Sequence, residues 1–356
     1  MKISIITLHC PANCGSVLQG YALCKFLRDR YGEGVSLIDY VPTYMETEGR
    51  GLRTLLRKLL FLRAYRSRTK NFQRFIKENC TLSPKRYTDY AMLEKDPPEA
   101  DLYITGSDQL WNPCFECGRD PAYYLKFVNN VPKLAYATSM GTDRYTEEQL
   151  AEIVEKTKDY YAISLREKCS CEQLASAGAG AVEWVCDPTF LLAPDVYHTV
   201  ATDYKHLGKF VAVYLVERSE LLDQTLEYFR SKGYKIVGVG GYLKKYKCDI
   251  HFKDAGPAEF LGLIRDASFV VATSFHASVF SQMFHKEFAI IPPKMNPARI
   301  EQLLGYTGLE DRIITDASQL VHLEKPIDYD AVQARLDDLI EHSKKWLIDS
   351  IEGEKR

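Results

Sequence analysis

The chain has 356 residues, a formal net charge of −2, 46% hydrophobic residues and 26% charged residues. This length predicts two domains of ordinary size. The near-neutral charge argues against a general nucleic-acid coat, and no stretch reaches the roughly 20 apolar residues of a membrane span. The first apolar run is too short for a signal peptide, so we expect a cytoplasmic protein.

Strand and helix signals alternate from the start of the chain. Buried strands are predicted at 3–8, 34–39, 101–105, 134–138 and 160–164. A helix is expected at 15–31, closed by Gly32, and a capping box from Thr146 to Gln149 opens a later helix. Alternation of this kind predicts a parallel α/β sheet.

A composition break at 187–208 precedes a second α/β series. Its strands are predicted at 210–216, 235–239 and 269–272, with helices at 221–231, 257–265 and, at the end of the chain, 332–351. We therefore expect two doubly wound domains, 1–190 and 208–328, followed by a terminal helix segment, 329–356, that packs back on the first domain. Ligands of such sheets bind at the carboxyl ends of the strands, so residues just after strands carry the most weight.

The turn after the first strand contains Asn13, Gly15 and Ser16. Its N–H groups are placed to bind a phosphate or a sugar hydroxyl. The turn matches neither the dinucleotide fingerprint nor the P-loop. A simple connecting turn, in which Gly15 supplies backbone freedom, explains the pattern equally well.

The stretch ITGSDQLWNP, residues 104–113, directly follows a predicted strand. Gly106 lets the chain turn sharply and presents Ser107 and Asp108 at the strand's carboxyl end. Trp111 and Asn112 in the same loop predict a sugar-contacting surface, because an indole face packs on a pyranose ring. The alternative is a helix N-cap aspartate followed by a core tryptophan.

Two further strand ends carry charged or titratable side chains. Arg166, with Lys168 close behind, follows one strand and suits bidentate contacts to carboxylate or phosphate; an exposed arginine in a helix's first turn is the alternative. His276 lies where a strand gives way to a helix, a position at which backbone N–H groups can hold an anion. A structural histidine is its alternative.

Residues 50–74 contain nine lysines or arginines and no acid. Leucines from Leu52 to Leu60 recur at helical spacing, so the segment predicts a basic amphipathic helix that can lie on an anionic membrane. The alternative is a helix packed on its domain with its cations in water or facing an anionic substrate. The ten cysteines are scattered, and the pair Cys114 and Cys117 has no second pair to complete a zinc site, so we expect no metal.

Five motifs occur in a fixed order along the chain. They are N-x-G-x-x-L-Q-x-Y-A-L at 13–23, G-S-D-Q-x-W-N-P at 106–113, S-x-R-E-K-x-S at 164–170, D-P-T-F-L-L at 187–192 and F-H-A-S-V-F-S at 275–281. In this order the chain resembles the polysaccharide pyruvyl transferase family over residues 3 to about 291.

The resemblance implies a GT-B-like pair of Rossmann-like domains with the active site in an interdomain cleft. It also implies transfer of a pyruvyl group from phosphoenolpyruvate onto two hydroxyls of a galactose-type sugar, with release of phosphate and no cofactor. The acceptor belongs to a capsule, exopolysaccharide or cell-wall glycan, or to its polyprenyl-diphosphate-linked precursor at the inner membrane face. A glycosyltransferase with a nucleotide-sugar donor and a non-catalytic glycan-binding protein of the same fold are the rivals.

Carried onto this sequence, the family's active-site residues fall on Arg166 and His276. We expect His276 to act as general acid or to hold phosphate, and Asp108 to orient or deprotonate the acceptor. The predicted donor-binding set is Arg166, Lys168, Ser274, Phe275 and Ser278. The predicted acceptor-binding set is Asn13, Gly15, Ser16, Gln19, Ser107, Trp111 and Asn112. Some members carry arginine where this chain has Ser274, so further anion binding is expected from Arg166, Lys168, the helix N–H groups or Lys294.

Overall fold

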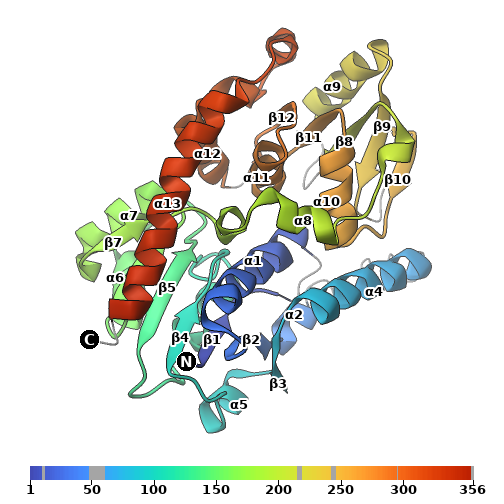
Figure 1. Ribbon diagram of the computed structural model, residues 1–356. Helices are drawn as coiled ribbons and strands as arrows, with labels where there is room; N and C mark the ends of the chain where they lie inside the picture. The colour runs from blue at the N-terminus through green and yellow to red at the C-terminus, as the bar shows by residue number, and fades with distance from the viewer. Residues whose placement is uncertain (10–12, 48–60, 215–218, 242–245, 295, 354–356) are drawn as a thin grey trace. The chain divides into compact units, whose positions relative to one another are not determined.

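The computed structural model describes residues 1–9, 13–47, 61–214, 219–241, 246–294 and 296–353 (Figure 1). The chain divides into two compact units. The first unit comprises Met1–Arg50, Ile76–Leu192 and Asp337–Arg356, and the second comprises Gly51–Phe75 and Ala193–Leu336. The basic segment that the sequence analysis placed in the N-terminal domain thus groups with the second unit.

The described part of the first unit contains a seven-stranded parallel sheet of order β3-β2-β1-β4-β5-β6-β7. Its strands are β1 (Ile3–Ile6), β2 (Val35–Tyr40), β3 (Leu82–Tyr87), β4 (Leu102–Thr105), β5 (Lys133–Thr138), β6 (Ala162–Leu165) and β7 (Val182–Trp184). Every residue of β1, β4 and β5 is buried, as expected for central strands of a parallel sheet that helices cover on both faces.

The described part of the second unit contains a five-stranded parallel sheet of order β10-β9-β8-β11-β12. Its strands are β8 (Phe210–Tyr214), β9 (Lys235–Val239), β10 (Ile250–Phe252), β11 (Phe269–Ala272) and β12 (Phe288–Ile290). Both sheets start in the middle, wind to one side and then cross to the other. Their topological switch points therefore lie between β1 and β4 and between β8 and β11, which is where open α/β sheets bind ligands.

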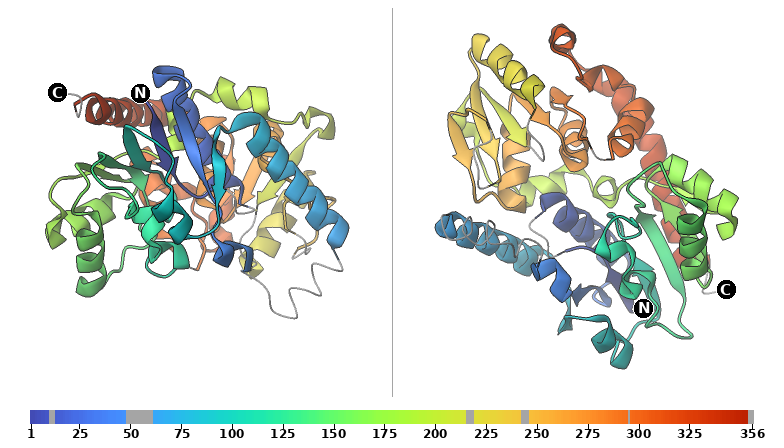
Figure 2. Two further views of the ribbon diagram at one scale, coloured as in Figure 1. Left: turned by 90° about the horizontal axis from the view of Figure 1, so that it is seen from below. Right: turned by 180° about the vertical axis from the view of Figure 1, so that it is seen from behind.

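Helices connect the strands in both units (Figures 1 and 2). They are α1 (Cys14–Tyr31), α2 (Thr43–Thr47), α4 (Leu62–Asn79), α5 (Tyr90–Lys95), α6 (Glu147–Thr157), α7 (Lys168–Leu174), α8 (Pro194–Val200), α9 (Glu220–Ser231), α10 (Pro257–Asp266), α11 (Phe275–Met283), α12 (Ala298–Thr307) and α13 (Tyr329–Gly353). The predicted capping box opens α6, where Thr146 and Gln149 exchange hydrogen bonds. None of the helices described is both long and apolar enough to cross a membrane.

The C-terminal part of α13 packs on the first unit. The Ser343 hydroxyl oxygen accepts a hydrogen bond from the Cys186 N–H at 2.8 Å, and the Trp346 and Tyr136 rings lie 6.4 Å apart. Leu347 is fully buried. The apolar stripe predicted for this terminal helix is thus covered.

The described part of the basic segment forms most of α4. Within the second unit, Ser67 and Asn71 donate hydrogen bonds to the side chain and the carbonyl of Asp254, respectively, and Phe72 is buried. Residues 48–60, which hold the predicted leucine stripe, lie outside the described residues. The helix therefore has an anchored face, and its arginines at 63 and 66 and Lys70 and Lys77 are exposed.

Candidate active site

Strands β1 and β4 approach each other closely at the switch point of the first sheet. The Gln19 side-chain amide donates to the Thr7 hydroxyl oxygen at 2.8 Å, and this hydroxyl donates to the Ser107 carbonyl oxygen at 2.8 Å. A Cβ atom on Gly106 would lie 3.0 Å from the Thr7 Cβ. Gly106 has no positive φ, so it serves this close approach rather than the sharp turn expected from the sequence.

Asp108 follows β4 in a conformation that non-glycine residues rarely adopt. Its φ is +77°, a strained value of the kind that concentrates at functional sites. The strain is held by a backbone hydrogen bond of 2.9 Å from the Ser139 N–H to the Asp108 carbonyl oxygen. One carboxylate oxygen, Oδ1, accepts from the Gln109 N–H at 2.8 Å. The other, Oδ2, is buried and has no hydrogen-bond partner among the described residues.

A bulge at the end of β5 directs the neighbouring loop. The pairing of β5 with β6 shifts register between Ala135 and Thr138. The Ser164 hydroxyl group bridges the irregularity by donating to the Ala135 carbonyl and accepting from the Ala137 N–H. The Ser139 hydroxyl, just past the bulge, donates to a Glu167 carboxylate oxygen at 2.7 Å. Bulges beside active sites commonly re-aim side chains in this way.

Arg166 lies in the interior, and the predicted direct contact with the donor is not what its geometry supports. Its side chain is 2% exposed, and two guanidinium nitrogens donate to Asp187 at 2.6 Å and to Glu167 at 3.3 Å. Burial lowers the pKa of Arg166, but Glu167, Asp187 and Asp108 outweigh that effect and hold it above its ordinary value. The buried guanidinium therefore holds the carboxylates of Asp187 and Glu167 in position.

Trp111 and Asn112 are also interior residues, which corrects their predicted place at a sugar-contacting surface. Trp111 is fully buried, stacks on Tyr124 at 5.6 Å and donates its indole N–H to the Tyr123 carbonyl at 3.1 Å. Asn112 is fully buried and bonds to Gln109 and to the Cys114 N–H. The core tryptophan that the sequence allowed as an alternative is the one observed.

The first turn of α1 contributes the remaining predicted acceptor residues. Asn13 caps the helix by accepting from the Gly15 N–H at 3.0 Å, and Gly15 and Ser16 are buried. Among the described residues, the buried side-chain oxygens of this unit without a hydrogen-bond partner include Gln19 Oε1, Ser107 Oγ, Asp108 Oδ2, Glu167 Oε2 and Ser170 Oγ. Each can accept a hydrogen bond, so this unit suits a ligand rich in donors, such as a polyol.

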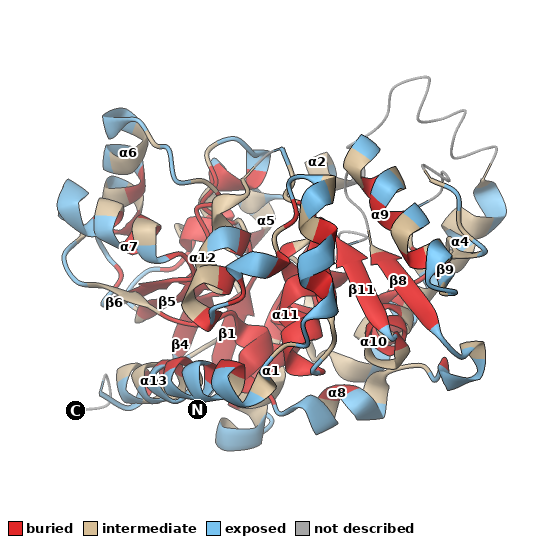
Figure 3. Ribbon diagram, turned by 90° about the horizontal axis from the view of Figure 1, so that it is seen from above, coloured by how far each residue is buried: buried red, intermediate tan, exposed pale blue. Residues whose placement is uncertain are grey.

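The switch point of the second sheet presents the start of α11. Ser274 occupies the N-cap position, but within the described residues no side chain caps the helix. His276 stands in the first turn and is 7% exposed. The Ser278 hydroxyl donates to the Phe275 carbonyl at 2.7 Å, so it serves the helix. Every residue of α11 is buried (Figure 3), which fixes the position of its N-terminal N–H groups.

One cation near this helix start was missed by the sequence analysis. Arg299, in the first turn of α12, has its guanidinium carbon 5.8 Å from the centre of the Phe275 ring. Lys294 and Lys168, the lysines predicted to bind the donor, are exposed, the latter on the first unit. The only sequence signal for Arg299 was its place at a helix start after Pro297, which resembles many surface arginines.

A second missed group lies just past β1. His9 is buried, and its ring nitrogens lie 3.1 Å from Asp39 Oδ1 and 3.3 Å from the Thr7 carbonyl oxygen. Arg86 donates to the other Asp39 oxygen at 2.8 Å. Burial raises the pKa of Asp39, but the hydrogen bonds from His9 and Arg86 bring it below its ordinary value. The group ties β1, β2 and β3 together.

Comparison with solved structures finds likeness over nearly the whole chain. S. aureus MnaA in a co-structure with UDP is 12% identical, with a TM-score of 0.54 and coverage of 99% of this chain and 97% of that chain. UDP-GlcNAc 2-epimerase from Neisseria meningitidis bound to UDP-GlcNAc is 8% identical, with a TM-score of 0.54 and coverage of 99% and 100%. At such identities the likeness shows the fold alone, and it confirms the predicted class of two Rossmann-like units of GT-B type.

No curated protein sequence matches the chain. The family model described as polysaccharide pyruvyl transferase matches residues 13–294. That span contains all five motifs, as well as Asp108 and His276. The chain therefore belongs to the polysaccharide pyruvyl transferase family.

Proposed function

We propose that the protein transfers the pyruvyl group of phosphoenolpyruvate onto two hydroxyls of a galactose-type sugar and releases phosphate. The acceptor is a bacterial capsule, exopolysaccharide or cell-wall glycan or its lipid-linked precursor. The observation that carries this proposal is the contrast between the two switch points. One presents buried oxygen acceptors around Asp108, and the other presents an uncapped helix start with His276.

The second unit suits the donor. Phosphoenolpyruvate carries a phosphate and a carboxylate, which bind best to cations and to N–H groups at a helix N-terminus. The start of α11 offers such N–H groups, and Arg299 lies beside it over Phe275. In this proposal Arg299 supplies the positive charge that other members obtain from an arginine at the position of Ser274.

The first unit suits the acceptor. A sugar hydroxyl donates one hydrogen bond, and three buried oxygens receive none from the described residues: Gln19 Oε1, Asp108 Oδ2 and Glu167 Oε2. An unpaired buried oxygen costs free energy that a bound hydroxyl recovers. In this proposal, Asp108 Oδ2 is the base that takes the proton of the attacking hydroxyl.

In the proposed reaction, His276 donates one proton and Asp108 accepts another. His276 gives a proton to the methylene carbon of phosphoenolpyruvate, which becomes a methyl group, and the adjacent carbon becomes an oxocarbenium-like centre. A sugar hydroxyl attacks that carbon and loses its proton to Asp108. The carbon–oxygen bond to phosphate then breaks, the second hydroxyl closes the ketal, and its proton leaves with the phosphate.

Phosphoenolpyruvate should raise the melting temperature of the purified chain, because a ligand that binds only the folded state stabilises it by mass action. UDP-N-acetylglucosamine should not, although it is the ligand named for one fold neighbour. Adding galactoside acceptors should then release inorganic phosphate, with a matching gain in acceptor mass. Stabilisation by the nucleotide sugar alone would favour a glycosyltransferase, and glycan binding without phosphate release would favour a binding protein.

Contact with the inner face of the cytoplasmic membrane forms part of this proposal. Replacing Arg63, Arg66 and Lys70 on α4 with glutamine should lower binding to vesicles that contain anionic lipid by about 100-fold, since each cation near such a surface contributes about 1 kcal/mol. These side chains are exposed. Vesicle sedimentation measures the effect.

The matched control for this experiment removes three exposed lysines elsewhere: Lys158, Lys205 and Lys247. Their loss changes net charge equally and should leave vesicle binding nearly unchanged. Equal loss in both triple variants would mean that net charge, rather than α4, drives binding. Equal retention would rule out a membrane role for the described part of α4.

A further inference from the structure

The first unit contains a cavity of about 500 Å³ that no sequence motif indicated. Three segments line it: residues 40–44 after β2, residues 88–90 after β3, and residues 116–120 in the loop after β4. Its volume falls within the range of about 300–1,000 Å³ that is typical of small-ligand sites. Because it follows β2 and β3, it opens at the same carboxyl edge of the sheet as Asp108.

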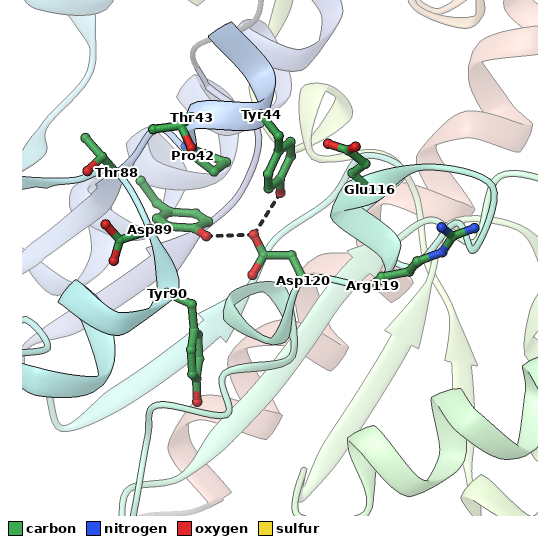
Figure 4. A pocket seen from close by; sticks show the side chains of 10 residues that line it. Pro42, Thr43, Tyr44, Thr88, Asp89, Tyr90, Glu116, Arg119 and Asp120 are labelled. Atoms are coloured by element: carbon green, nitrogen blue, oxygen red, sulfur yellow. Dashed lines mark hydrogen bonds between the residues drawn. The ribbon is translucent and has the colours of Figure 1, made fainter. Parts of the chain in front are cut away.

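Asp120 fixes the orientation of two phenol groups in this cavity. The Tyr40 and Tyr44 hydroxyls both donate to Asp120 Oδ2, at 2.6 and 2.8 Å. Figure 4 shows Asp120 between Tyr44 on one side and the segment of Tyr90 on the other. The other Asp120 oxygen accepts from the Ala122 N–H at 2.9 Å. Both phenol protons are donated to Asp120, so the lone pairs of the phenol oxygens make this wall of the cavity a hydrogen-bond acceptor.

The charge of the lining excludes an anionic ligand. The lining contains three carboxylates, those of Asp89, Glu116 and Asp120, and one cation, Arg119. The Arg119 guanidinium donates to the Pro113 carbonyl oxygen at 3.2 Å. Phosphoenolpyruvate and nucleotide diphosphates carry only acceptor oxygens on their charged groups and would be repelled. A neutral ligand with many hydroxyl donors matches both the charge and the acceptor-rich wall.

A continuous chain of contacts joins the cavity to Asp108. The Asp120 N–H donates to the Cys117 carbonyl at 3.2 Å, and the Cys117 thiol lies 3.4 Å from the Gln109 carbonyl oxygen. The Gln109 N–H donates to Asp108 Oδ1. Burial, and then the carboxylates of Asp108 and Asp120, raise the pKa of the Cys117 thiol to about 12. Both carboxylates therefore lie within electrostatic reach of one side chain.

We infer that this cavity is a subsite for one neutral sugar ring of the acceptor glycan, with Tyr44 and Tyr90 supplying ring surface and the phenol and carboxylate oxygens accepting from sugar hydroxyls. The inference rests on the proposed function for the identity of the glycan. Aromatic rings with a polar edge suit this role because their bodies are apolar and their tips form hydrogen bonds. The subsite holds the glycan while another part of it reaches Asp108.

The test uses the full chain and variants of Tyr44. Tyr44→Ala removes the ring and should raise the KM for a neutral galactoside disaccharide at least about tenfold, with the KM for phosphoenolpyruvate unchanged. Tyr44→Phe removes only the hydroxyl and should raise the KM for the disaccharide by about 2- to 10-fold. Tyr161→Phe, a matched loss of one hydroxyl on the same unit, should leave both constants unchanged.

A second variant guards against a folding defect. Glu116 is exposed, so Glu116→Gln should fold normally and still weaken disaccharide binding, measured directly by saturation-transfer NMR without phosphoenolpyruvate. A uronic-acid disaccharide should bind more weakly than its neutral counterpart. Unchanged disaccharide binding in both Tyr44→Ala and Glu116→Gln would overturn the inference. Disaccharide binding through these residues in a protein that releases no phosphate would instead overturn only the proposed reaction.

Discussion

The variant His276→Ala should lower the kcat for phosphate release by about 10²- to 10⁴-fold, the usual contribution of a positioned general acid. The imidazole stands in the first turn of α11 and is held there because the whole helix is buried. An imidazole exchanges protons near neutral pH, whereas the backbone N–H groups beside it bind anions without transferring a proton. Steady-state phosphate release at saturating phosphoenolpyruvate and acceptor measures the loss.

The control for this variant is His322→Ala, because His322 is exposed on the same unit and the substitution is identical. It should keep the wild-type rate. Thermal melting with phosphoenolpyruvate should show that His276→Ala remains folded and binds the donor. The companion variant Asp108→Asn should also slow turnover while leaving donor binding intact. A His276→Ala rate within about threefold of wild type would remove this residue from the chemistry.

The central strands could be predicted because each is a continuous apolar run. The predicted strands at 235–239 and 269–272 coincide with β9 and β11, and the others differ from the observed ones by a few residues at their ends. The strands that were missed, β3, β7, β10 and β12, all lie at sheet edges. β3 contains Pro84, Lys85 and Arg86, residues that an edge strand tolerates and a buried one does not.

The position of the candidate site could be predicted, but not the direction of each side chain. Residues that follow parallel strands lie at the carboxyl edge of their sheet, so the sequence places Asp108 at that edge of the first sheet and His276 at that edge of the second. Whether a side chain at such a place turns inward depends on partners that are distant in sequence. Trp111 stacks on Tyr124, and Arg166 donates a hydrogen bond to Asp187. Asp187 opens one of the five motifs, but no local pattern indicates either of these contacts.

The cavity around Asp120 was missed for the same reason. Its three lining segments are separated from one another by 25 or more residues, and none contains a motif on its own. Tyr40 ends a buried strand, a position typical of a core residue. Asp120 precedes Pro121, a pattern that indicates a helix cap, and Asp120 does cap that helix. Only the folded sheet brings the two side chains to 2.6 Å.

Replacing Arg166 with methionine should lower the free energy of unfolding by about 3–5 kcal/mol, the cost of breaking a buried ion pair from one side. The Asp187 side chain is fully buried and that of Glu167 is 3% exposed. Without the guanidinium, both carboxylates would stay in a medium of low polarity with their charge uncompensated. Urea unfolding, followed by a probe in the first unit such as the buried Trp111, measures the loss.

Arg30→Met is the matched control, because the same substitution there breaks an exposed pair with Glu352 in which both side chains are more than 40% exposed. Such pairs contribute about 0–1 kcal/mol. The comparison also separates two roles for Arg166. If Arg166 only positions its neighbours, the variant is less stable but its folded form keeps the wild-type affinity for phosphoenolpyruvate. If Arg166 binds the donor, the variant loses that affinity. We expect the first outcome, because the guanidinium already contacts two carboxylates. A large loss of donor affinity with unchanged stability would instead show that Arg166 binds the donor.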